Sequence, residues 1–264
     1  MVIDFHTHMF PDSLAVKTIP LLAERSGLMA HTDGTVKQTL EKMKEAGVTC
    51  AVQQNIATNP RQMTKVNDFA ISCNQLDEIV AFGSVHPEAD SLEYELDKLK
   101  DAGILGIKLH PDYQGFFVDD PKMQPVYEAI LKRGFILQFH TGLDLGLPEP
   151  IHAAPKALSR TLGLFSGEKV VFAHMAGFQM ADDALEYIIG KDVYIDTSCA
   201  FGYADENMLL TMFKSHPENK ILFATDCPWG NFKTDIKALL SLDLTDELKE
   251  KILHKNAEKL LAFK

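Results

Sequence analysis

The stretch "VIDFHTHMF", residues 2–10, ends a short apolar run with two histidines separated by a single threonine. Successive side chains of a β-strand point to opposite faces, so His6 and His8 share a face and their imidazoles can converge. Neutral imidazole is a common metal ligand, and such a pair suits a metal ion better than an apolar core. The stretch therefore predicts a buried first strand that carries metal ligands at its carboxyl end.

Similar apolar runs recur along the whole chain. Each is followed by a polar stretch and then by an amphipathic segment long enough for a helix, an alternation that is typical of βα units. The runs are apolar enough to be covered on both faces of a sheet. The eight predicted strands are Val2–His6, Val48–Gln53, Ile79–Val85, Ile104–Leu109, Phe135–Phe139, Lys169–Ala173, Val193–Asp196 and Ile221–Thr225.

Helical patterns fill the gaps between these strands, for instance at Thr35–Ala46, Leu92–Ala102 and Gln124–Arg133. A glycine directly follows each of the three segments, where a left-handed cap ends a helix at low cost. Eight strands in strict alternation with helices favour a closed (β/α)8 TIM barrel over an open doubly wound sheet, and no glycine-rich nucleotide signature supports the open sheet. We predict one α/β domain, a TIM barrel, over residues 1–264.

Composition and charge restrict the classes of function. The 264 residues are 46% apolar and 24% charged, which is ordinary for a folded globular chain. The net charge of -11 disfavours nucleic acid and anionic membranes as partners. We find no signal peptide and no run of about 18 apolar residues that would span a membrane. These features predict a cytoplasmic protein with a small-molecule substrate, and homo-oligomerisation is compatible with such a barrel.

Histidines gather where the predicted strands end, which is where barrels of this kind build their active sites. Those near strand ends are His6, His8, His86, His110, His140 and His174, and Asp226 follows the last strand. Imidazoles with one carboxylate form a donor set for Zn²⁺, which Fe²⁺ or Mn²⁺ also uses. The four cysteines lack CxxC spacing, so we expect reduced thiols rather than a closed structural zinc site. The pattern predicts an open, catalytic metal site.

Four motifs follow one another at matching strand ends: "DFHTH" at 4–8, "FHTG" at 139–142, "AHMAG" at 173–177 and "ATDCPWG" at 224–230. With them the chain resembles the amidohydrolase superfamily, in particular its amidohydrolase-2 branch of metal-dependent TIM barrels. That branch includes decarboxylases related to aminocarboxymuconate semialdehyde decarboxylase. The resemblance runs from end to end, because "KEKILHKNAEKLL" at 249–261 is similar to the branch's closing helix.

The resemblance implies roles for individual residues. His6, His8, His140 and Asp226 would hold one divalent metal, with Zn²⁺ the first expectation and Mn²⁺ or Fe²⁺ the alternatives. Asp226 would also handle a proton, and His174 would act as the second-sphere acid or base, or as a further ligand. A metal-activated water could then attack a polarised carbonyl group.

Lys108 and His110, in "GIKLHP", share one face of the fourth predicted strand. Binuclear members of the superfamily carry a carboxylated lysine or a glutamate at this place to bridge two metals. Lys108 and His110 are therefore candidates either for a second metal or for the wall of the substrate pocket.

Other residues carry weaker expectations. His152 lies in a long loop after the fifth strand and Trp229 follows the eighth, so both are candidate substrate contacts. His86 is expected to be structural. Three further histidines fall in polar loop or helix contexts and are expected to be exposed to solvent: His31, His216 and His254.

Several functions compete. The leading hypothesis is a metal-dependent hydrolase of a small amide, cyclic amide, lactone or ester. The alternative is non-oxidative decarboxylation of an aromatic or unsaturated acid, for which Arg25 and Arg61 are the arginines available to hold a carboxylate. A related metal-dependent deoxyribonuclease is disfavoured by the acidic charge, and a catalytically inactive scaffold should hold no stoichiometric metal.

Overall fold

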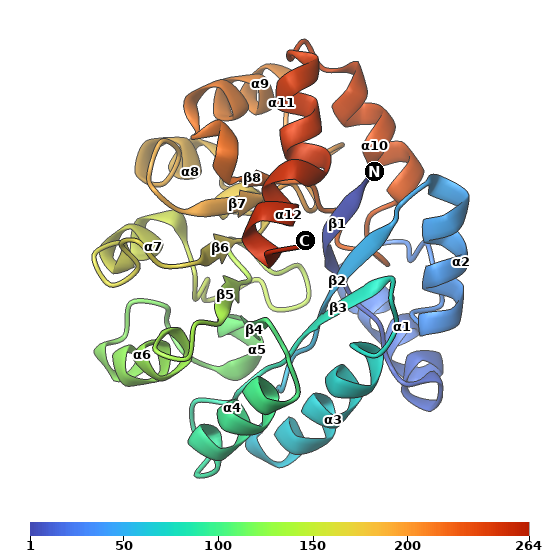
Figure 1. The fold of residues 1–264 in the computed structure, drawn as a ribbon. Coiled ribbons are helices and arrows are strands. Elements are labelled where there is room, and N and C mark those ends of the chain that lie inside the picture. Colours follow the sequence, from blue (N-terminus) through green and yellow to red (C-terminus); the bar gives the residue numbers. More distant parts are fainter. Residues whose placement is uncertain (264) are drawn as a thin grey trace.

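The computed structural model describes residues 1–263, and its eight parallel strands form a ring that helices surround (Figure 1). All eight predicted strands are present, with bounds that differ by a few residues. They are β1 (Ile3–Thr7), β2 (Cys50–Gln54), β3 (Ile79–Phe82), β4 (Gly106–Leu109), β5 (Ile136–Phe139), β6 (Val170–Phe172), β7 (Tyr194–Asp196) and β8 (Ile221–Leu222).

The strands pair in chain order as two groups, β1 to β3 and β4 to β8. Backbone hydrogen bonds join the groups at both seams. Gly83 N donates to Gly106 O at 2.9 Å between β3 and β4, and Phe5 N donates to Phe223 O at 2.8 Å between β1 and the residue after β8. The closed (β/α)8 TIM barrel is thereby confirmed, as one domain.

The helices of the outer ring agree with the predicted positions. Gly47, directly after α2, has a φ of +77°, as the predicted left-handed cap requires. The longer helices are α1 (Asp12–Ser26), α2 (Val36–Ala46), α3 (Met63–Cys73), α4 (Leu92–Asp101), α6 (Gln124–Leu131), α9 (Glu206–Ser215) and α10 (Phe232–Ser241). The shorter ones are α5 (Pro111–Gln114), α7 (Pro155–Thr161), α8 (Ala181–Tyr187), α11 (Asp246–Glu250) and α12 (Asn256–Leu261).

Apolar packing divides the barrel into two ends. Residues from the starts of strands, such as Ile3 and Ile136, pack in one cluster with Leu260 of α12. In Figure 1, α12 lies across the centre of the ring. The amino-terminal end of the barrel is therefore filled by apolar side chains, and the carboxyl end is left for polar ones. Within residues 1–263 no helix has both the length and the apolar character that crossing a membrane would need.

The expectation that His216 is exposed is wrong. Its side chain is 3% exposed, because it closes the gap between α9 and β7. Its Nε2 donates to Val193 O at 2.9 Å, and its Nδ1 accepts from Gly190 N at 3.3 Å. Burial lowers the pKa of His216 to about 4, since an imidazolium there would lose its hydration. His31 and His254 are half-buried rather than fully exposed.

We expect His216→Gln to remove part of the acid sensitivity of the fold. The folded-state pKa of about 4 lies below the ordinary value of 6.5, so the unfolded chain takes up its proton first as the pH falls. This stability is present above pH 6.5 and is lost as the pH falls through 4; between about pH 7 and pH 5 the loss is roughly 2 kcal/mol. Gln does not titrate. Denaturant unfolding of both proteins at the two pH values checks this, with His254→Gln as control; equal pH dependence in all three would contradict it.

Candidate metal centre

Three donor atoms converge at the carboxyl end of the barrel. His6 lies in β1, His8 follows it, and Asp226 follows β8 with its N–H donating to His6 O at 2.8 Å. The distance between His6 Nε2 and His8 Nε2 is 3.2 Å; Asp226 Oδ1 lies 3.2 Å from the former and 3.1 Å from the latter. We call these three atoms the donor triangle. The predicted convergence of His6 and His8 on one face is confirmed.

The surroundings show which atoms of the triangle carry lone pairs. His8 Nδ1 donates to Gln54 O at 3.0 Å, which leaves His8 Nε2 without a proton. His6 Nδ1 lies 3.1 Å from Asp196 Oδ2 and donates to it, so His6 Nε2 is likewise free. No hydrogen bond from residues 1–263 reaches the buried Asp226 Oδ1. Three lone pairs this close repel one another unless a cation lies between them, and ligands around a tetrahedral metal stand about 3.4 Å apart. The triangle fits a divalent metal.

Burial sets the protonation of these groups. It lowers the pKa of His6 well below its ordinary value, and Lys108 beside it adds to the effect. For Asp226, burial opposes ionisation, but the influence of the adjacent His6 and His8 rings outweighs burial and lowers the pKa of Asp226 below the usual range. The triangle therefore presents a neutral His6 imidazole and an ionised Asp226 carboxylate, the forms that bind metals.

Asp196, at the end of β7, contacts the His6 ring at Nδ1, the nitrogen that does not belong to the donor triangle. It is fully buried, accepts from Gln138 Nε2 at 2.8 Å and His174 N at 3.0 Å, and fixes the His6 ring through Nδ1. Ser198 N donates to it as well, at 3.0 Å. Sequence analysis missed both Asp196 and Gln138. The available signal was a single polar residue inside each of two apolar strands, "ILQF" and "YID".

We expect Asp196→Asn to weaken metal binding by about 10–100-fold, the usual effect of losing the carboxylate that orients a ligating histidine. Competition against a chromophoric chelator measures this. Asp192→Asn is the matched control, because that carboxylate is exposed and pairs with Lys220. An unchanged metal affinity in Asp196→Asn would refute the orienting role.

Lys108 lies beside the triangle, as its position on β4 predicted. Its side chain is fully buried and its Nζ is 3.2 Å from His6 Nε2. Burial lowers its pKa to about 8, so the amine is still largely protonated at neutral pH. Lys108 thus adds a buried positive charge next to the three donors.

His140 and His174 form a second layer rather than part of the triangle. His140 Nδ1 is 3.0 Å from His174 Nε2, and its ring stacks on His110 with centroids 4.1 Å apart. Its Nε2 is buried and has no hydrogen-bond partner in residues 1–263. His110 also reaches Asp144 Oδ2, at 3.3 Å from Nε2, so His110, His140 and Asp144 make a second group of metal-type donors.

The two residues predicted to contact substrate lie further out. His152 Nδ1 is 3.0 Å from Asp112 Oδ1, and its ring stacks on Phe117 at 4.5 Å. Trp229 is half-buried, and its N–H donates to Asp226 O at 2.8 Å. The structure therefore ties Trp229 to the metal centre through the backbone and His152 to α5 through Asp112.

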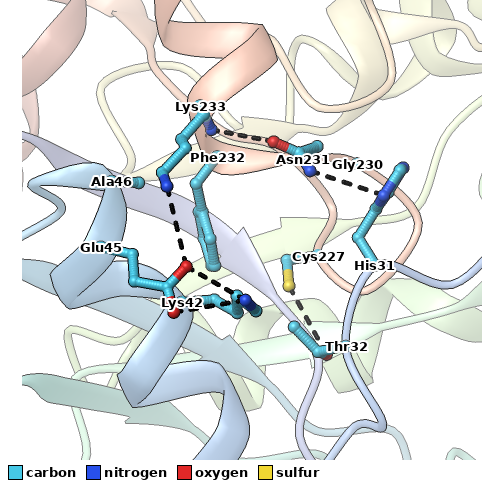
Figure 2. A pocket seen from close by; sticks show the side chains of 10 residues that line it. All are labelled: His31, Thr32, Lys42, Glu45, Ala46, Cys227, Gly230, Asn231, Phe232 and Lys233. Carbon is cyan, nitrogen blue, oxygen red and sulfur yellow. Dashed lines mark hydrogen bonds and ion pairs between the residues drawn. The ribbon is translucent and has the colours of Figure 1, made fainter.

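A separate hollow of about 240 Å³ lies behind the loop that carries Asp226 (Figure 2). Cys227 and Phe232 line it together with the ends of three charged side chains. Glu45 lies 3.0 Å from Lys42 Nζ and 3.7 Å from Lys233 Nζ, so one carboxylate pairs with two ammonium groups. The three side chains together therefore carry a net charge of +1, and each lysine already has a carboxylate partner.

A closed barrel with histidines and an aspartate at its carboxyl end defines an enzyme of the metal-dependent TIM-barrel class. The amidohydrolase family model, that of the amidohydrolase-2 branch, matches residues 3–263. The chain belongs to this family, which confirms the resemblance seen in its motifs. A search of curated protein sequences gave no match.

Solved structures agree with the fold over its full length. 5-Carboxyvanillate decarboxylase from Sphingomonas paucimobilis is 15% identical, with a TM-score of 0.75 over 100% of this chain and 99% of that one. A TIM-barrel protein from Bordetella bronchiseptica is 22% identical, with a TM-score of 0.78 over 99% of this chain and 98% of that one. Dihydroxybenzoic acid decarboxylase from Polaromonas is 17% identical, with a TM-score of 0.72 over 99% of this chain and 96% of that one. It was solved with manganese and the inhibitor 2-nitroresorcinol.

Proposed function

We propose that the protein is a divalent-metal-dependent non-oxidative decarboxylase of an aromatic or unsaturated carboxylic acid. The observation that carries this proposal is Lys108, a buried amine 3.2 Å from His6 Nε2. With a divalent ion, the charges of Lys108, Asp196 and Asp226 leave a net charge of about +1 in a desolvated site. A carboxylate substrate neutralises that charge, whereas a neutral amide or lactone leaves it uncompensated.

His6, His8 and Asp226 are the proposed metal ligands. His140 is the candidate fourth ligand, because its buried Nε2 has no partner among the described residues. Manganese is the first ion to test beside zinc, since it is bound in the Polaromonas decarboxylase. When bound, the ion supplies an electrophilic anchor for the substrate carboxylate.

The chain's own residues would supply the proton that replaces the carboxylate. Decarboxylation breaks the bond between carbon and the carboxylate, leaves the electron pair on that carbon, releases CO2 and needs one proton to form the new C–H bond. Asp226 is ionised at rest, so we assign it a relay role in which it accepts a proton and passes it to that carbon. We assign the supply of that proton to His174, which offers a ring nitrogen within 4.8 Å of an Asp226 carboxylate oxygen and contacts His140 through Nε2. The thiol of Cys199 donates a hydrogen bond to Asp226 Oδ2 at 3.3 Å and thus orients the carboxylate.

Hydrolysis of a small amide, cyclic amide, lactone or ester is the second candidate. The donor triangle would serve it equally well, with a metal-activated water as nucleophile. The specific observation in its favour is that the group His110, His140 and Asp144, together with Lys108 if its amine is carboxylated, offers donors for a second ion. The whole-length likeness to two decarboxylases supports decarboxylation over it.

Product analysis tests the proposal. Protein loaded with manganese or zinc is incubated with 2,6-dihydroxybenzoate and other monohydroxy and dihydroxy benzoates, and in parallel with an aryl ester, a lactone and a cyclic amide. We expect one CO2 per acid consumed and no product from the neutral compounds. Cleavage or ring opening of a neutral compound, with no CO2 from any acid, would replace decarboxylation by hydrolysis.

A further inference from the structure

A cavity of about 360 Å³ adjoins the metal centre on the side of α8 and α9. His174 and Cys199 line it, and both also contact the site: His174 through Nε2 to His140, Cys199 through Sγ to Asp226 Oδ2 at 3.3 Å. The side chain of Cys199 therefore lies between the cavity and the Asp226 carboxylate. Its size lies within the range of cavities that hold small organic ligands.

Aromatic and sulfur-containing side chains make up nearly half of the residues that line this cavity. A row of rings runs from the reacting end outward, with centroids 6.1 Å apart between His174 and Phe178 and 5.1 Å apart between Phe178 and Tyr203. Met208 and Met212 of α9 complete the lining, and Met212 is almost fully buried. Rings packed edge to face and polarisable methionines are favourable surroundings for an aromatic or other flat apolar group.

The backbone at the inner end of the cavity is strained. His174, Met175 and Ala176 form a short turn in which all three non-glycine residues have positive φ, at 56°, 54° and 65°. Such conformations cost free energy and persist where the surrounding structure enforces them, commonly at functional sites. The turn fixes the imidazole of His174 at the boundary between the cavity and the metal centre.

The lining carries no positive charge. None of the residues around the cavity, all of which belong to the described part of the chain, is lysine or arginine; Asp182 and Asp205 are acidic and exposed. A second carboxylate on a substrate would be buried here without a cation, which is costly. The reacting carboxylate, in contrast, would have the Lys108 amine near it under the proposed function.

We propose that this cavity receives the part of the substrate remote from the reacting carboxylate, and that it selects an acid with a single carboxylate and an uncharged aromatic remainder over a dicarboxylate. This inference rests on the proposed decarboxylase function and narrows its substrate class. It predicts discrimination between two molecules that differ by one remote carboxylate and in nothing else.

The test uses two inhibitors and the metal-loaded wild-type protein. 2-Nitroresorcinol carries a nitro group in place of the reacting carboxylate, and 3,5-dihydroxy-4-nitrobenzoate adds a carboxylate on the opposite ring carbon. Titration calorimetry with manganese-loaded protein should show binding of 2-nitroresorcinol at least 10-fold tighter. Met208→Lys, which places a cation in the cavity, should reduce this preference at least 5-fold, whereas Asn207→Lys on the exposed side of α9 should leave it unchanged.

The outcomes separate the two levels of the proposal. Equal binding of both compounds, or tighter binding of the carboxylated one, would overturn the cavity's role and leave the decarboxylase proposal in place. Failure of both compounds to bind manganese-loaded protein would overturn the cavity's role and count against the decarboxylase proposal as well. A preference that Met208→Lys and Asn207→Lys change equally would also contradict selection within the cavity.

Discussion

Asp226→Asn is expected to lower kcat for decarboxylation by roughly 10³-fold, the scale of a lost general acid–base group. The asparagine keeps an oxygen at the third corner of the donor triangle but cannot carry and deliver a proton. Because the substitution is isosteric, the fold and part of the metal affinity should survive. Steady-state CO2 release per bound metal, with the metal content of each sample measured, separates the chemical step from metal loss.

Asp235→Asn is the matched control. Asp235 is also buried near the carboxyl end of the barrel, and burial raises its pKa to about 7, so that a neutral amide resembles the partly protonated acid. It accepts a hydrogen bond from Thr234, away from the donor triangle. Activity above a tenth of wild type in Asp226→Asn at equal metal content would contradict the assignment of the proton to Asp226.

The double substitution His6→Ala, His8→Ala is expected to reduce bound metal from about one equivalent to below about one tenth, and activity with it. Two of the three corners of the donor triangle are lost, and the remaining carboxylate oxygen holds a divalent ion poorly by itself. Elemental analysis of protein purified without chelator and without a metal-affinity column checks this.

His31→Ala, His254→Ala is the control for removing two histidines. Both residues are half-buried and lie outside the metal centre, so metal content and activity should remain at wild-type level. Stoichiometric metal in the His6, His8 variant would refute the donor triangle as the site. Two equivalents in the wild type would instead promote Lys108 and His110 to ligands of a second ion.

Much of the barrel could be predicted from local pattern. Buried parallel strands need continuous apolar runs, and each run here is followed by a segment with helical periodicity, so strand number and order follow from the sequence. The bounds were less accurate at β8. Its predicted range runs to Thr225, but the regular strand ends at Leu222, and residues 223–226 continue beside β1 through single hydrogen bonds.

The metal centre was predictable only where neighbours in sequence become neighbours in space. His6 and His8 converge because strand geometry places them on one face. Asp196 and Gln138 were missed because their contact with His6 crosses the barrel and leaves no spacing signal. The buried place of His216 depends on how α9 packs against the end of β7, which its polar local sequence does not reveal.

The sequence alone does not distinguish hydrolysis from decarboxylation, because both reactions use the same set of metal ligands. The arginines available to hold a substrate carboxylate, Arg25 and Arg61, are both exposed. The cation that matters is Lys108, whose distance to His6 appears only when β1 and β4 are brought together in the barrel.

The most direct test of the account is the position of the metal. We would crystallise manganese-loaded protein and collect anomalous diffraction data at a wavelength where manganese scatters strongly. The account predicts one peak within about 2.3 Å of His6 Nε2, His8 Nε2 and Asp226 Oδ1. A peak among His110, His140 and Asp144 with none at the donor triangle, or no peak in protein that remains active, would contradict it.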